Sequence, residues 1–578
     1  MSRPGTLECK PMQHAILKTA AAVGILGLGL AACSGSGSGG SSGGGGTAAG
    51  KPLVIESTSV TTPSQNFNPY VQSGTGYSAQ ATGLIYEPLY IFNVMDPTQP
   101  PIPVLASGQP TWSNGGRTLT VPIRSGVRWS DGKPFTASDV AFTYNLIRKN
   151  PSLYTASAPL VTSATASSPT SVTLTFSSAQ YANLFLIGQV YIVPQHVWGS
   201  VGNPVTYTDP NPVGTGPYQL ATYSSHGFLL KRNPRYRDAG AVRVPEVDFP
   251  FYASNANLVP PIASGAIDWA GSNLGPGLKS TYLAKSPHNT TWDGASPYFA
   301  ANNVVTLWFN VTRAPLNDPA VRRAISYGID RQQLAVQGES GYEAPATSSS
   351  GLLLPIDNSY LAPGLGSDLP ATGSAAKVAA ILSGDGYAKV GGKWEKNGKK
   401  ISFSITDPTA YNDYYVDDQL IASQLNKLGF DVTVAGNGSP TAWQADFNNG
   451  NFDATIHWSN QGPNPFYYYE NWLNDAFTAP IGSPAAGDNG RFKSAAAQAA
   501  LAKFAGSDSP ATQKAAITSL EQIMSAQVPM APLLYGAAWS EISTRSYTGW
   551  PTSSDAYMTP VPNSPYLEQV VLHLKPAA

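Results

Sequence analysis

Cysteine is almost absent from this sequence of 578 residues, which contains only Cys9 and Cys33. The chain after Cys33 can therefore form no disulfide bond and no cysteine metal centre. This absence excludes thiol nucleophiles and cysteine-ligated zinc as the basis of function in that part. Its stability must come from packing and hydrogen bonding alone.

Charged residues are also scarce. Lys, Arg, Asp and Glu make up 12% of the chain, and the formal net charge is −1. The densest basic segment, Lys231–Arg237, is short and is interrupted by Asn233 and Pro234. No Lys/Arg run is long enough to follow a phosphate backbone, so we expect no nucleic-acid partner.

The residues that most hydrolases need are missing too. Histidines occur singly, and the sequence contains no His-Glu-x-x-His motif, no phosphate-binding loop and no convincing nucleophile elbow. Asp417 and Asp418 are adjacent on a predicted helix, where neighbouring side chains face different ways and suit acid–base chemistry poorly. A secreted hydrolase stays the main alternative class, but we expect no catalytic residue, no metal and no cofactor.

Only one long apolar run is present, Thr19–Ala32, and its fourteen residues are fewer than the ~20 that a membrane span needs. It follows Lys18 and ends in small residues, which predicts a secretory signal over residues 1–32, with Met12 as an alternative start. Leu30–Cys33 resembles a bacterial lipobox, and this implies cleavage before Cys33 and lipidation of its sulfur. We then expect residues 33–50, the lipidated cysteine and a flexible Gly/Ser linker, to hold the protein at the outer face of the cytoplasmic membrane.

Helical and strand patterns alternate along the rest of the chain. This alternation predicts an α/β protein, and 578 residues are too many for one hydrophobic core, so we expect two or three domains. Because both ends read as strands, we expect them to return to one domain. The predicted strands cover residues 53–56, 118–123, 401–405, 430–434 and 570–574, and the predicted helices cover 138–149, 319–328 and 414–428.

One segment carries a specific family resemblance. Ile123–Val140 reads as a strand, a Ser-Asp-Gly turn and a capped helix, and it resembles the signature of family 5 extracellular solute-binding proteins. These are the peptide/nickel-type receptors of ABC importers. Further matches follow in the family's order along nearly the whole chain: Tyr86–Leu89, Val193–Trp198, Gly214–Tyr218, Leu307–Asn310 and Asp318–Arg331.

The resemblance implies a fold and a set of partners. The fold is a two-lobed periplasmic-binding-protein type II fold with an inserted third domain, of the large cluster C type. The implied receptor is a monomer that closes on a ligand and delivers it to an ABC permease with its ATPase subunits. Carried onto this chain, lobe I comprises residues 51–90, 213–300 and 536–578, the inserted domain 91–212, and lobe II 301–535.

The segment Ile456–Tyr469 is the strongest candidate for ligand binding. In oligopeptide receptors of the family, the resemblance places here a Trp-x-x-Asp-x-x-x-Pro pattern whose Asp pairs with the peptide ammonium. Trp458 and Pro465 match this pattern, but Gln461 stands at the Asp position. A neutral amide forms weaker bonds to an ammonium than a carboxylate does. Gln461, Asn460 and Asn464 can instead both donate to and accept from sugar hydroxyls.

Two ligand classes therefore stay open: an oligopeptide, which the family favours, or a β-linked oligosaccharide, which could stack on aromatic rings. At strand spacing, Tyr468 would face away from Tyr467 and Tyr469, which makes those two the candidates. Three more residues are candidates from their place in the family pattern. The predicted ligand-binding residues are Trp458, Asn460, Gln461, Asn464, Tyr467, Tyr469, Trp308, Asn310 and Asn68.

Overall fold

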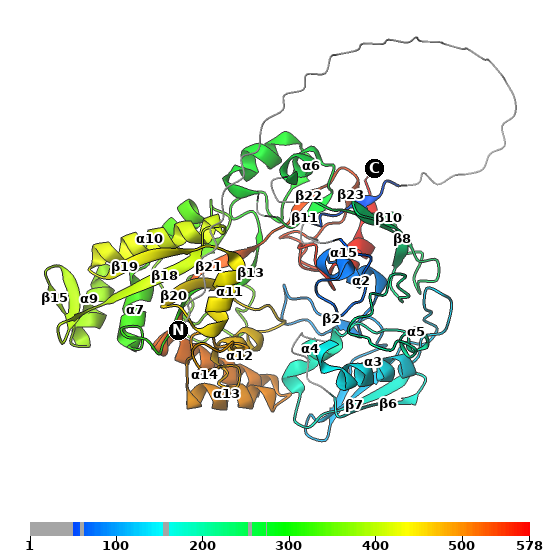
Figure 1. Cartoon of the computed structure of the whole chain (residues 1–578), viewed down its shortest axis with the longest axis horizontal. Coiled ribbons are helices and arrows are strands. Elements are labelled where there is room, and N and C mark those ends of the chain that lie inside the picture. The colour runs from blue at the N-terminus through cyan, green and yellow to red at the C-terminus, as the bar shows by residue number, and fades with distance from the viewer. Residues whose placement is uncertain (1–49, 58–62, 154–160, 253–256, 273, 578) are drawn as a thin grey trace, which may run out of the picture. The chain divides into compact units, whose positions relative to one another are not determined.

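The longest sheet has six strands in the order β14-β21-β13-β20-β18-β19 (Figure 1). β13 runs antiparallel to both β21 and β20, whereas β18 runs parallel to β19 and β20. The apolar side chains of this sheet pack against α7 (Pro319–Gly328) and α10 (Asn412–Leu428), which were predicted, and against α9 (Ala375–Gly384), which was not predicted. The strands are β13 (Ala300–Phe309), β14 (Ala344–Pro345), β18 (Ser402–Pro408), β19 (Asp431–Asn437), β20 (Ala454–Trp458) and β21 (Met530–Ala538).

The computed structural model describes most of the chain after residue 49, and these residues belong to one unit. The predicted signal, Cys33 and the Gly/Ser tract lie outside the described residues. No helix in the described part is both long and apolar enough to cross a bilayer. The described ranges are 50–57, 63–153, 161–252, 257–272 and 274–577.

A second group of sheets combines residues from both ends of the chain with a middle segment. β1 pairs in parallel with β10, and β22, close to the C-terminus, pairs with β11 and β12. The two ends of the chain thus lie in one region, where the Tyr547 hydroxyl also donates to the Lys51 carbonyl, and the assignment of this region to one lobe stays a prediction. The strands are β1 (Leu53–Val54), β8 (Tyr218–Ser224), β9 (Gly227–Arg232), β10 (Glu246–Pro250), β11 (Trp269–Ala270), β12 (Asn289–Thr290), β22 (Glu541–Ser543), β23 (Tyr547–Thr548) and β24 (Lys575–Pro576).

The strand predicted over residues 570–574 is wrong, because this segment forms the helix α15 (Leu567–His573). Leu567, Val570, Val571 and Leu574 are all buried, and their spacing of three and four residues is that of one helix face. A five-residue apolar run is too short to show this period by itself.

A four-stranded antiparallel sheet forms within the segment predicted as the inserted domain. The helix α3 (Ala137–Lys149) packs on it, and Thr136 and Asp139 form the capping box at its start. The family signature segment Ile123–Val140 thus contains the predicted turn and capped helix start, but the strand β5 ends at Pro122, just before it. The strands are β4 (Thr111–Ser113), β5 (Thr118–Pro122), β7 (Ser171–Thr175) and β6 (Ser163–Ser168).

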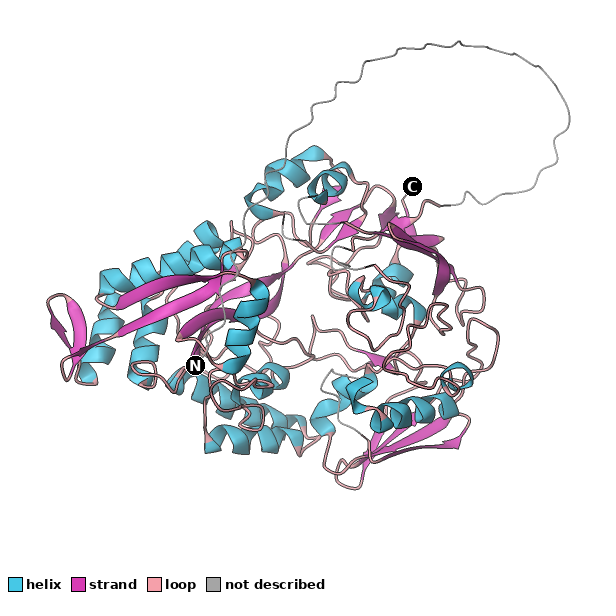
Figure 2. Cartoon of the chain, in the orientation of Figure 1, coloured by secondary structure: helices cyan, strands magenta, loops and turns pink. Residues whose placement is uncertain are grey.

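The remaining elements connect these sheets or cover them (Figure 2). Four helices follow β19 in the six-stranded part: α11 (Pro440–Asn449), α12 (Phe466–Leu473), α13 (Ala495–Ala505) and α14 (Pro510–Gln527). The short elements are α1 (Thr75–Ser78), α2 (Thr82–Ile85), α4 (Leu184–Gly188), α5 (Gln195–Trp198), α6 (Val259–Ser264), α8 (Arg331–Gln333), β2 (Tyr90–Ile91), β3 (Ile102–Pro103), β15 (Ala388–Val390), β16 (Lys393–Lys396) and β17 (Lys399–Lys400). The lobe boundaries stay predictions.

Candidate functional site

Trp458 is the centre of the candidate site, because it is a large aromatic side chain left open to solvent. It is the last residue of β20 and is 37% exposed, although β20 begins with three buried residues. The ring centroids of Tyr411 and Tyr414 lie 6.4 and 6.2 Å from its own. These rings form an aromatic platform at the end of the central sheet, of the kind on which apolar or sugar faces stack.

His457 packs against Trp458 and helps to fix the position of its ring. Its ring stacks on Trp458 and on Phe447, each with a centroid distance of 4.3 Å, and on Trp443 at 5.3 Å. Burial lowers the pKa of the His457 imidazole to about 4, so the ring is neutral at physiological pH. His457 therefore acts as a flat packing surface and holds Trp458 in place.

The polar residues predicted to bind ligand follow the platform in the loop after β20. Asn460 is exposed, Gln461 and Asn464 are half-buried, and the Oδ1 atom of Asn464 accepts from the backbone N–H of Phe466 at the start of α12. Asn460 and Gln461 line a narrow pocket together with Asn302 of β13 and the segment Val94–Met95. The structure thus brings Gln461 beside residues far away in the sequence.

Asp357 lines the same pocket and was missed by sequence reasoning. Its Oδ2 atom accepts hydrogen bonds from the Tyr468 hydroxyl at 2.6 Å and from the Leu353 N–H at 3.1 Å. Burial raises the pKa of this carboxyl to about 7. No local motif marks Asp357, because its loop reaches the site only through the fold.

A larger pocket of about 610 Å³ adjoins the platform on its Tyr411 side. It is lined by Asn412, Asp413 and Val416 at the start of α10 and by Gly275 and Pro276. Tyr342 also lines this pocket, and its hydroxyl donates to the Gly275 carbonyl at 2.8 Å. The aromatic and polar run Tyr411–Tyr415 was the sequence signal that could have pointed to this pocket.

Five predicted ligand residues lie instead in the interior, which corrects that part of the prediction. Trp308 is 1% exposed and packs edge-on against Phe447. The side chains of the two asparagines form hydrogen bonds with backbone carbonyls. Asn310 donates to the Gly450 carbonyl, and Asn68 donates to the carbonyls of Pro204 and Tyr207. A buried amide or indole with such neighbours holds loops together and offers a ligand no surface. Also buried are Tyr467 and Tyr469.

The tyrosine run does not have strand spacing, and this prediction is wrong. Tyr467, Tyr468 and Tyr469 all lie on α12, and each buried hydroxyl has a partner. The Tyr467 hydroxyl donates to the Ala182 carbonyl, whereas that of Tyr469 donates to the Ser350 carbonyl at 2.8 Å. These rings fix α12 against neighbouring segments, so the loop before α12 is held rigidly.

The described residues bring together no three His, Cys, Asp or Glu side chains in a position to hold a metal ion. What the site offers is noncovalent: an exposed aromatic platform, amides in a narrow pocket on one side and a larger polar pocket on the other. The narrow pocket has a volume of only about 20 Å³, enough for a group about the size of a water molecule, so the larger pocket is the one with room for a ligand.

The arrangement of sheets is that of a type II periplasmic binding protein. An oligopeptide ABC transporter periplasmic oligopeptide-binding protein from Thermotoga maritima superposes with a TM-score of 0.81, at 24% identity, over 91% of this chain and 99% of that one. The same protein with bound mannohexaose gives a TM-score of 0.73 over the same shares of both chains. These similarities show the fold.

The family follows from the sequence match. The model of the bacterial extracellular solute-binding proteins, family 5 Middle, matches residues 100–479, and the chain belongs to this family. Protein XP55 of Streptomyces lividans is 30% identical over 58% of this chain and 59% of its own length. The oligopeptide-binding protein OppA of Bacillus subtilis is 25% identical over 41% of this chain and 46% of its own length. The chain thus matches about half the length of these relatives.

Proposed function

We propose that this chain is the ligand-capturing receptor of an ABC import system. It is anchored through Cys33 at the outer face of the membrane, binds a short oligopeptide and passes it, unchanged, to a permease driven by ATPase subunits. The observation that carries this proposal is the exposed Trp458 platform between two pockets. The family membership and the name of the relative OppA support the peptide class.

A β-linked oligosaccharide is the second candidate ligand, and Gln461 is the observation that favours it. An amide at this position supplies no negative charge for a peptide ammonium, whereas Trp458 and Asn460 suit a sugar ring and its hydroxyls. The Thermotoga maritima neighbour carries mannohexaose in one of its structures, which supports this alternative as an analogy of fold.

Closure of two lobes on the ligand requires binding energy. To move a closed population from about 1% to about 99%, the ligand must prefer the closed form by about 5.5 kcal/mol. One hydrogen bond contributes about 1 kcal/mol. An aromatic stack together with several amide bonds can reach the required total, which is why we place the ligand on the platform and in the larger pocket, with one small polar group at the amides of the narrow pocket.

The Trp458→Ala variant tests the site. We expect its affinity for the bound ligand class to fall at least about tenfold, because a stacked aromatic contact contributes about 0.5–1.5 kcal/mol beyond its buried area and the buried ring surface contributes further. Isothermal titration calorimetry with panels of peptides and cello-oligosaccharides measures this change. Val390→Ala is the matched control, since Val390 is also exposed but lies on the β15 hairpin. Unchanged affinity in Trp458→Ala would place the ligand elsewhere.

The Gln461→Asp variant separates the two ligand classes. For a peptide ligand, the new carboxylate should raise affinity for peptides with a free amino terminus about tenfold and leave acetylated peptides unaffected, because only the ammonium gains a charged partner. For a sugar ligand, the same change removes an amide donor and weakens binding. Hydrolysis of any panel member would contradict the receptor proposal itself.

A further inference from the structure

Three pockets adjoin one another around α14, away from the candidate site. The middle pocket, of about 710 Å³, lies between α13 and α14. It shares Gln522 and Ala526 with a pocket of about 560 Å³ on the side of α7 and α9. It shares Phe492, Lys493 and Gln527 with a pocket of about 830 Å³ near the end of α14. We call this continuous surface the basic trough.

The charged side chains that line the basic trough are all positive. Among the described residues that line the three pockets there is no Asp or Glu, and none of the cations there forms an ion pair within 4.0 Å of a described carboxylate. The cations are Arg322, Arg323, Lys377, Arg491, Lys493 and Lys503. Since the whole chain has a net charge of −1, this concentration does not follow from its composition.

Nearby carboxyl groups are engaged elsewhere or are neutral. Asp318 and Asp385 both pair with Lys396, which lies outside the trough. Asp488 is buried close to Arg491, and burial raises the pKa of its carboxyl to about 8. The two buried arginines donate to backbone carbonyls: Arg322 donates to Gln527, and Arg491 donates to Asn448, while the Nε of Arg491 has no partner among the described residues. Asp318 attracts Arg322 and Asp385 attracts Arg323 without an ion pair within 4.0 Å, so the positive charge of the trough is only partly compensated.

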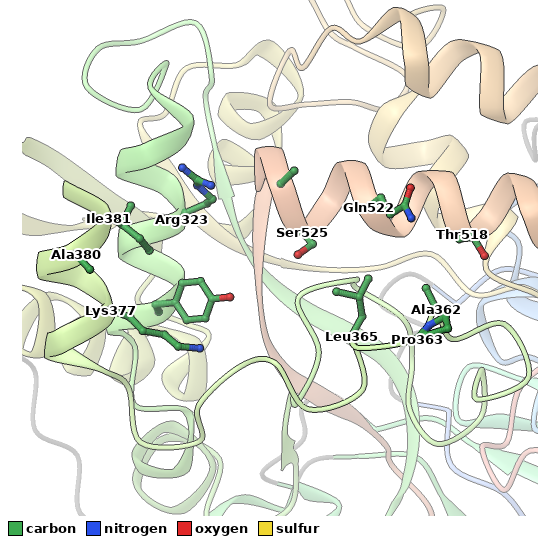
Figure 3. Close-up of a pocket in the computed structure, with 12 residues that line it drawn as sticks. Arg323, Ala362, Pro363, Leu365, Lys377, Ala380, Ile381, Thr518, Gln522 and Ser525 are labelled. Carbon is green, nitrogen blue, oxygen red and sulfur yellow. The ribbon is translucent and has the colours of Figure 1, made fainter. Parts of the chain in front are cut away.

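The floor of the trough is formed by small, uncharged side chains. The outward faces of α13 and α14 expose Ala496, Ala499, Ser519, Gln522 and Ala526, which leave room for a backbone to approach closely. Exposed helix faces normally carry many charged side chains. On the α7 side, Figure 3 shows Arg323 and Lys377 across the pocket from Gln522, Ser525 and Thr518 of α14. Cations thus border a shallow floor that can form hydrogen bonds.

We propose that the basic trough is a docking surface for an acidic helical segment of a protein partner. Each pocket alone has the volume of a small-molecule site, but their continuity suits an elongated occupant. Binding of a helix in a groove and recognition of acidic motifs by clusters of cations are two recurrent modes, and the trough combines a floor of small residues with flanking cations. This surface is separate from the Trp458 platform, so the inference goes beyond ligand capture and holds for either ligand class.

The probe is a fluorescein-labelled peptide of repeated Glu-Ala-Ala-Ala-Glu units, about 20 residues long so that it forms a helix. Fluorescence anisotropy with the full chain should show saturable binding that weakens as salt rises. The triple variant Lys377→Glu, Lys493→Glu, Lys503→Glu should bind at least about tenfold more weakly, because three exposed cations are reversed. A matched triple variant, Lys279→Glu, Lys399→Glu, Lys400→Glu, makes the same charge change at exposed positions outside the trough.

Each result decides the proposal. Loss of binding in the first variant, with binding kept in the second, supports it, provided that both variants keep the melting temperature of the parent chain. Equal losses in both variants overturn it, since the effect would then be one of net charge. No saturable binding up to about 1 mM peptide also overturns it. Binding to phosphatidylglycerol vesicles without peptide binding would assign the trough to a membrane surface instead.

Discussion

Replacing Trp308 by alanine is expected to lower the free energy of unfolding by about 3–5 kcal/mol. Trp308 lies on β13, which pairs with β20 on one side and β21 on the other, so its loss opens a cavity at the centre of the largest sheet. Its indole packs against Phe447, 5.2 Å between ring centroids, inside a buried cluster that also contains Phe452 and Met530. Urea unfolding followed by circular dichroism measures the change.

Two further variants separate packing from ligand contact. Trp458→Ala removes the same side chain from an exposed position and is expected to change the free energy of unfolding by less than about 1 kcal/mol. Trp308→Phe keeps most of the buried volume, and the indole Nε1 of Trp308 has no hydrogen-bond partner among the described residues, so no bond is lost. If Trp308→Ala is as stable as its parent, the residue is not a core residue and its prediction as a ligand contact returns.

Capping residues and glycines in the sequence were sufficient to predict where several helices begin or end. The helix α3 begins at the Thr136–Asp139 box, α7 begins after Asp318, and α10 ends at Gly429, whose φ of +105° suits glycine best. Each signal acts within one turn of the chain. A pattern within a few residues therefore predicts where such helices begin or end.

The site could be predicted only in part, because burial depends on the whole fold. Trp308 and Trp458 lie in similar apolar strands, yet strand pairing buries one and leaves the other at the end of its strand. Asn68 and Asn310 have the same donors and acceptors as Asn460, but loops distant in sequence already use them. Asp357 joins the site from a segment that carries no ligand-binding motif, and the run Tyr411–Tyr415 gives only a weak signal. The sequence therefore predicts the loop after β20 but not the walls that face it.

The stability of this protein is expected to fall as pH rises from about 4 to about 8. The cause is a cluster of buried carboxyl groups beneath α10: Asp417 lies against Glu339, and Asp418 lies against Asp407. Burial, with repulsion between neighbouring carboxylates, holds the pKa of Glu339, Asp417 and Asp418 well above the usual range.

The pKa values of nearby carboxyl groups set the pH range over which stability falls. Burial raises the pKa of Asp407 to about 7, although its carboxylate accepts from the Ile456 N–H at 2.9 Å. Burial also raises the pKa of Glu343 to about 8, although its Oε1 atom accepts from the Ala537 N–H at 2.9 Å. Other buried carboxyls are raised in the same direction, to about 7 or 8: Asp357, Glu470, Glu521 and Asp488.

Whether stability rises or falls with pH depends on which state, folded or unfolded, binds more protons. Below the ordinary carboxyl pKa, near 4, these groups are protonated in both the folded and the unfolded chain. Between about 4 and the raised values, only the folded chain keeps the protons, so each unit of rising pH favours the unfolded chain by about 1.4 kcal/mol per such proton. The stabilisation is complete at low pH and is lost as pH rises through the raised pKa values.

Asp418→Asn isolates the cluster from the other groups. The amide of Asn carries no charge at any pH, and its NH₂ group can donate to an ionised Asp407. The folded variant therefore binds one proton fewer than the folded parent chain in this pH range. We expect this variant to lose stability less steeply, by about 1.4 kcal/mol per pH unit, and to be more stable than its parent near pH 8. Asp508→Asn, at an exposed position, is the matched control and should keep the parent slope. Calorimetric melting of all three proteins across this range gives the slopes. If the parent becomes more stable as pH rises, the buried carboxyls are ionised in the folded chain, and a cation or a rearranged loop must compensate them.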